Sequence, residues 1–214
     1  MAHPELEALA LRHLPERFLR ALTEVAFLAR RTAWEECASF ANPEAQNLRP
    51  YVCRAHLEGS IRGAAERNGL ESRVLKEPGQ PWNHTEVVSG PIVLTAASVP
   101  TPLAPVDRAE YREGYARSNQ LYLESLGQEP PGDAPLYVLF LHSRSLWPED
   151  DQAKFGHLPG SVHLAFPASD LGGYVHDINL IDRFPEVVKK YVPQDWDSEA
   201  VVRYVAQARK TAFK

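Results

Sequence analysis

The hydrophobic period of the chain changes at Gly69, and this change divides the 214 residues into two unlike parts. Before Gly69 apolar side chains recur about every 3.6 residues, a pattern that predicts amphipathic helices. One long helix is expected over residues 16–39, and another over residues 42–69 that is restarted or kinked at Pro50. Residues 1–69 are therefore expected to form a helical layer of about three helices.

Beyond Gly69 the apolar residues alternate or run together, and 14 of the 18 prolines lie beyond residue 77. The continuous apolar run Leu136–Leu141 predicts a central strand that is buried on both faces. Strand-like patterns cover residues 72–76, 84–89, 92–99, 136–141, 162–166 and 174–181.

Helical patterns interrupt and follow these strands. An inserted helix is expected over residues 107–126, a further one over 182–191 and a C-terminal helix over 197–213. The fold class expected is α+β: an N-terminal helical layer, then an antiparallel or mixed sheet of five to six strands with flanking helices. We expect one domain over residues 1–214, with a helical part (1–69) and a β-rich part (70–214).

Composition excludes several classes. The net charge is -5, and it falls entirely beyond residue 69, because nine Glu balance nine Arg before that point. This argues against general binding along a nucleic-acid backbone and leaves the Arg-bearing helices as the better candidates for such contact. No apolar stretch suits a membrane span, and early acidic residues argue against a secretory signal, so a cytoplasmic location is expected. Cys37 and Cys53 cannot form a Cys-rich zinc site, and we expect neither a metal nor a cofactor.

Familiar catalytic motifs are missing from the sequence. It contains no P-loop, no GxGxxG after a strand, no GxSxG elbow and no kinase set. The ExK of a restriction-type nuclease is also missing. Arg49 and His56 match the R-x4-6-H spacing of HEPN-type ribonucleases, but Pro50 and the β-rich remainder depart from that all-helical family. We therefore assign no family.

Four polar residues are candidates for acid–base chemistry. His84 and Glu86 lie two apart on a predicted strand, so alternation directs both to one face of the sheet. His142 and Arg144 follow the buried strand, where a rigid element can present polar groups. The alternatives are a cross-strand hydrogen bond for the first pair, and backbone capping with an ion pair to nearby acids for the second.

The stretch 143–160 is the longest predicted loop between strands, and long loops often bind something. Its aromatic and imidazole side chains are candidates for partner contact: Trp147, Phe155 and His157. On the inserted helix Arg108 and Arg112 lie four apart beside a tyrosine stripe, which suits nucleic acid, although packing of that stripe on the sheet is favoured.

The sequence therefore predicts a cytoplasmic binding protein that engages a protein or nucleic-acid partner through the 143–160 loop and a helical face. The alternative is a hydrolase or nuclease without a sequence motif, whose site would combine His84, Glu86, His142 and Arg144. A third interpretation is a structural or regulatory subunit that forms a homo-oligomer. The two leading interpretations differ in one spatial property, namely whether those four side chains line one pocket.

Overall fold

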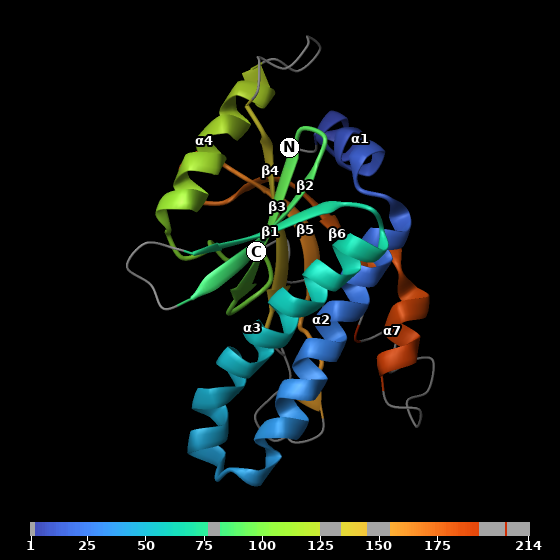
Figure 1. Ribbon diagram of the computed structural model, residues 1–214, viewed down its shortest axis with the longest axis vertical. Helices are drawn as coiled ribbons and strands as arrows, with labels where there is room; N and C mark the ends of the chain where they lie inside the picture. Colours follow the sequence, from blue (N-terminus) through green and yellow to red (C-terminus); the bar gives the residue numbers. More distant parts are fainter. Residues whose placement is uncertain (1–2, 77–81, 125–133, 145–154, 193–203, 205–214) are drawn as a thin grey trace.

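The computed structural model describes residues 3–76, 82–124, 134–144, 155–192 and Tyr204 (Figure 1). Its strands are β1 (Glu71–Lys76), β2 (Asn83–Ser89), β3 (Ile92–Val99), β4 (Leu136–Ser143), β5 (Val162–Pro167) and β6 (Tyr174–Asn179). Its helices are α1 (Pro4–His13), α2 (Glu16–Glu36), the 3-10 turn η1 (Cys37–Ser39), α3 (Asn42–Arg67), α4 (Glu110–Glu124), α6 (Leu180–Arg183) and α7 (Pro185–Tyr191). The expected C-terminal helix 197–213 lies outside the described residues, apart from Tyr204.

The six strands form one sheet in the order β1-β2-β3-β4-β5-β6. Neighbouring strands are antiparallel except β3 and β4, which run parallel and are connected through α4. The α+β prediction is confirmed, and of its two options the sheet is the mixed one. The sixth strand ends earlier than its pattern suggests because the Asn179 side chain accepts hydrogen bonds from the amides of Ile181 and Asp182, which starts α6.

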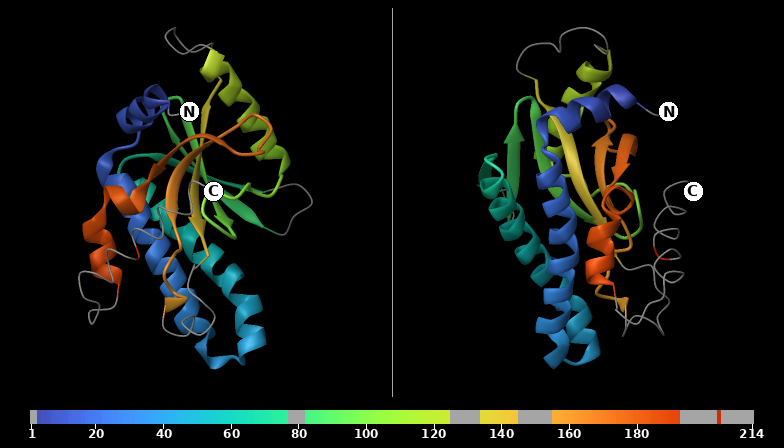
Figure 2. Two further views of the ribbon diagram at one scale, coloured as in Figure 1. Left: turned by 180° about the vertical axis from the view of Figure 1, so that it is seen from behind. Right: turned by 90° about the vertical axis from the view of Figure 1, so that its right-hand side faces the viewer.

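Helices cover both faces of the sheet (Figure 2). Leu136, Val138 and Phe140 of β4 pack into the larger core with α1, α2, α3, α6 and α7. The alternate residues of β4 pack into a second core with α4 and the segments around it. The apolar run is therefore buried on both faces, as predicted.

The long helix α3 differs from expectation at Pro50. It runs from Asn42 to Arg67 as one helix with Pro50 inside it, although proline removes one backbone hydrogen bond from a helix. Beyond Pro50 the residues Cys53, Leu57 and Ile61 are buried in the larger core, and this packing holds the helix in place.

The α2–α3 pair extends past the edge of the sheet at which β3 and β4 end (Figure 1). Register pairs Val99 with Ser143, so both strands have their carboxyl ends at this edge. None of the helices in the described ranges is long and apolar enough to cross a membrane.

Candidate functional site: an arginine-lined cavity

A cavity of about 980 Å³ lies between the projecting parts of α2 and α3 and the carboxyl ends of β3 and β4. The carboxyl ends of parallel strands are a usual place for ligands, because the loops that follow can converge there. The floor is made of small residues on β3, namely Ala96, Ala97 and Ser98. Ala33 and Ala38 line the helical side in the same way. Small side chains at these positions leave the volume unfilled.

Five arginines line this cavity, and they come from separate parts of the chain: Arg30 on α2, Arg49 and Arg54 on α3, Arg112 on α4, and Arg144 after β4. Among the residues that the structure describes, the lining contains two carboxylic acids, Glu58 and Asp107, and no lysine. A chain of net charge -5 thus concentrates positive charge in one hollow.

These guanidinium groups have few protein partners. Arg30 Nη2 donates to the Gly156 carbonyl at 3.4 Å, and Arg112 Nη1 donates to the Asp107 carbonyl at 2.9 Å. Within the described part of the chain none of the five forms an ion pair with a carboxylate. The Nε atoms of Arg30, Arg49 and Arg112 are also buried without a hydrogen-bond partner there. Buried charges are normally paired, so this donor capacity is available to a ligand.

Arg30 is held in an unfavourable environment for a cation. Desolvation by burial lowers its pKa, and the nearby positive charge of Arg144 lowers it further. An anion in the cavity would raise the pKa of Arg30 again, because a nearby opposite charge favours the charged form.

His142, from the end of β4, is a neutral imidazole in this site. It is 3% exposed, and burial lowers its pKa to about 3, with the charge of Arg30 adding to the effect. Its Nδ1 atom is buried and has no hydrogen-bond partner among the described residues. The ring can therefore donate or accept one hydrogen bond without carrying charge at neutral pH.

Glu58 is the buried carboxylate of the lining. The amide of Thr85 on β2 donates to its Oε2 at 2.6 Å, which joins α3 to the sheet. Burial raises the pKa of Glu58, and the hydrogen bonds from Thr85 oppose that shift. The group is therefore a candidate for exchanging a proton inside the cavity.

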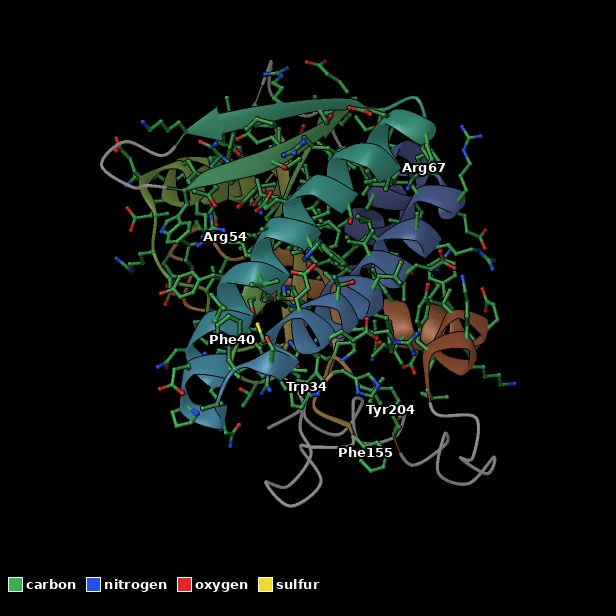
Figure 3. All side chains as sticks on the ribbon, turned by 60° about the horizontal axis from the view of Figure 1, so that its bottom comes forward. Trp34, Phe40, Arg54, Arg67, Phe155 and Tyr204 are labelled. Carbon is green, nitrogen blue, oxygen red and sulfur yellow. The ribbon has the colours of Figure 1, made fainter. Side chains whose placement is uncertain are left out.

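Aromatic rings border the arginines. The Arg49 guanidinium lies 3.8 Å from the centroid of the Trp34 ring. Tyr51 and Trp82 stack on each other with centroids 5.2 Å apart and planes inclined by 18°. In Figure 3 Arg54 lies midway along α3, and Trp34 lies closer to the turn that connects the two helices. Guanidinium and aromatic groups thus share the wall of one hollow.

The four expected acid–base residues lie in two places. His142 and Arg144 line the cavity, whereas His84 and Glu86 do not. His84 Nε2 and Glu86 Oε1 are 3.4 Å apart, and the His84 ring stacks on Tyr111 of α4 with centroids 3.9 Å apart. Alternation along β2 directs this pair away from the face that contacts Glu58. The pair is therefore formed as expected, but it belongs to the α4 face of the sheet.

The expected partner-binding residues are also dispersed. Trp147 lies outside the described residues. Phe155 packs against the larger core, and His157 is half-buried. Arg108 is exposed and lies 3.6 Å from Glu113, whereas Arg112 reaches the cavity.

The pair with HEPN-like spacing does not form a joint site. Arg49 lines the cavity, but His56 does not, and its Nε2 lies 3.0 Å from Glu36. Sequence reasoning missed Arg30, Arg54 and Glu58. One signal was present for Arg30: it interrupts a buried helical stripe whose neighbours, Ala29 and Ala33, are unusually small.

No family model matches the sequence, and no curated protein or solved structure matches it either. Among the residues that the structure describes, no group of three or more His, Cys, Asp or Glu is placed to hold a metal ion. The cavity itself therefore carries the functional argument.

Proposed function

We propose that this protein binds a phosphate-bearing anion in the arginine-lined cavity. The observation that carries the proposal is the set of guanidinium groups that line the cavity without a carboxylate partner in the described part of the chain. Arginine matches phosphate because its planar fork can donate two parallel hydrogen bonds to one anion. The charged cations that line the cavity in the described part of the chain are all arginines, and this fits phosphate recognition better than general attraction of counter-ions.

The dimensions and charge of the cavity support a small ligand. Its volume of about 980 Å³ lies at the upper end of the range for small-molecule pockets, roughly 300–1,000 Å³. A surrounding protein of net charge -5 repels extended polyanions, while the enclosed positive charge attracts a compact one.

Two described residues of the predicted partner loop 143–160 lie at this site. Arg144 and Gly156, which lie on either side of residues 145–154, both line the cavity. We infer that Arg144 contacts the ligand, and contact of the 143–160 loop with a protein partner remains a prediction of the sequence. The hydrolase alternative is supported less well, because only His142 and Arg144 of its four residues line the cavity.

Calorimetric titration with inorganic pyrophosphate tests the proposal. We expect saturable binding that weakens as salt is added, because salt screens the charges. Arg144→Met is expected to weaken it about tenfold or more, the equivalent of one lost charge-assisted hydrogen bond. Arg108→Met is the matched control, since Arg108 is exposed and lies outside the lining.

Two results would contradict phosphate binding: no saturable heat at millimolar pyrophosphate, or equal weakening by both variants. A phosphate-release assay on the same mixtures separates binding from hydrolysis. We expect no release above the rate of the free ligand, and release that is lost in His142→Gln would favour the hydrolase alternative.

A further inference from the structure

The aromatic residues at the cavity identify the class of ligand more narrowly. We propose, on the basis of the proposed phosphate binding, that the ligand is a nucleotide whose base stacks on the Tyr51–Trp82 pair while its phosphates bind the arginines. The proposal requires a stacking surface and a phosphate site in one hollow, and the lining contains both.

The Tyr51–Trp82 pair is available as a stacking surface. Tyr51 is 54% exposed and Trp82 is 39% exposed, although both are large aromatic side chains. Their near-parallel arrangement, with planes inclined by 18°, lets a third planar ring extend the stack. Exposed aromatic faces beside cationic groups are the usual way in which proteins hold a base.

Arg54 connects the stacking surface to the phosphate site. Its guanidinium carbon lies 5.9 Å from the centroid of Trp82, and its Nη2 donates to the Asn83 carbonyl at 3.5 Å, the residue after Trp82. One turn further along α3, Glu58 marks the interior of the same cavity. A ligand in contact with Trp82 therefore lies beside Arg54.

The part of the cavity that Arg30, Arg144 and His142 line suits the phosphates. Arg30, Arg144 and His142 are close enough for the Arg30 charge to depress the pKa of His142 and for Arg144 to depress that of Arg30. Neither Arg30 Nε nor His142 Nδ1 has a partner there in the described chain. A terminal phosphate offers three oxygen acceptors and negative charge, which satisfy these donors together.

A comparison of ADP with pyrophosphate tests the assignment, because the two share a diphosphate and differ in the nucleoside. We expect ADP to bind the intact protein roughly tenfold tighter or more, the usual gain from stacking one base. Trp82→Ala and Tyr51→Ala should each weaken ADP binding more than pyrophosphate binding, so that the ratio of the two affinities falls towards one. Phe40→Ala is the control, because Phe40 is also an exposed aromatic of the helical pair but does not line the cavity (Figure 3).

The outcomes separate the two proposals. Equal affinity for ADP and pyrophosphate would overturn the nucleotide assignment and retain phosphate binding, whereas no binding of either would overturn both. A 5′-phosphorylated single-stranded hexanucleotide that binds tighter than ADP would also overturn it, because the ligand would then be a nucleic-acid end.

Discussion

The two ends of the strand pair β3–β4 treat buried polar groups in opposite ways. Near the start of β4, the buried Asn119 side chain of α4 accepts a hydrogen bond from the Tyr137 amide at 2.7 Å. Its Nδ2 donates to the carbonyls of Tyr137 and Pro167 at 3.0 Å each. The Tyr137 hydroxyl in turn lies 2.7 Å from the hydroxyl of Thr95. We call this end of the strand pair, where these buried polar groups are hydrogen-bonded, the sealed end.

At the carboxyl ends of the same strands, which we call the open end, two buried polar atoms lack a hydrogen-bond partner among the described residues. They are His142 Nδ1 and Arg30 Nε. Buried polar groups in proteins are nearly always satisfied, and an unsatisfied one costs roughly 1–3 kcal/mol. Unsatisfied groups are tolerated mainly where function requires them. The comparison shows satisfied polar groups at one end and unsatisfied ones at the other, and this difference supports the proposal that a ligand binds at the second end.

The largest effect on stability is expected from a substitution at the sealed end. Asn119→Leu keeps the approximate side-chain volume and leaves the Tyr137 amide and the Pro167 carbonyl without their partner. We expect a loss of about 3 kcal/mol in the free energy of unfolding, measured by urea denaturation. Gln120→Leu, on the exposed face of the same helix, is the control. A loss below about 1 kcal/mol would show that this end is not sealed by Asn119.

The buried imidazole of His142 at the open end should make the free energy of unfolding depend on pH. Burial lowers the folded-state pKa of His142 to about 3, while the unfolded value is near 6.5. Below pH 6.5 His142 binds a proton in the unfolded chain but not in the folded protein. The free energy of unfolding therefore falls as the pH drops from 6.5 towards 3. The contribution is about 1.4 kcal/mol per pH unit, or about 2 kcal/mol between pH 6.5 and 5.0.

His142→Gln removes this contribution, so its stability profile should be flatter than that of the wild type over the same interval. Urea denaturation at a series of pH values measures the difference. His56→Gln serves as the control, because His56 is an exposed histidine beside Glu36. Parallel profiles for the His142 variant and the wild type would contradict a buried neutral imidazole at this end.

The elements of the fold could be predicted because burial leaves a local record. The alternation at Val162, Leu164 and Phe166, and the unbroken apolar run of β4, each correspond to a strand. The parallel pairing of β3 with β4 left no such record, because it joins residues about 44 positions apart, as in Ile92 with Leu136. Pairing depends on how α4 packs, which a local pattern does not contain.

The candidate site was less accessible to sequence reasoning. Strand alternation correctly placed His84 and Glu86 on one face, but which face carries the cavity depends on α3 and α4 together. His142, Arg144 and Arg112 were candidates on local grounds. Arg30 and Arg54 belong to the site only because α2 and α3 project past the sheet, and that is a property of the assembled fold.

The smallest effects are expected from substitutions of two neighbouring arginines of α2, Arg30 and Arg31. Arg31 Nη2 donates to the Tyr191 carbonyl at 3.3 Å, and its guanidinium carbon lies 5.5 Å from the Tyr191 ring. Arg31→Met should therefore lower the free energy of unfolding by about 0.5–1 kcal/mol. Among the described residues Arg30 has one long hydrogen bond, to Gly156, and burial desolvates its guanidinium group.

Replacing a buried charge that lacks an ion-pair partner by an apolar side chain of similar length is commonly neutral or stabilising. We therefore expect Arg30→Met to leave the free energy of unfolding unchanged or to raise it by up to about 1 kcal/mol in phosphate-free buffer. Urea denaturation of both variants side by side makes the comparison. If Arg30→Met lowers the free energy of unfolding more than Arg31→Met does, Arg30 stabilises the fold. Its unpaired charge would then no longer support ligand binding at the open end.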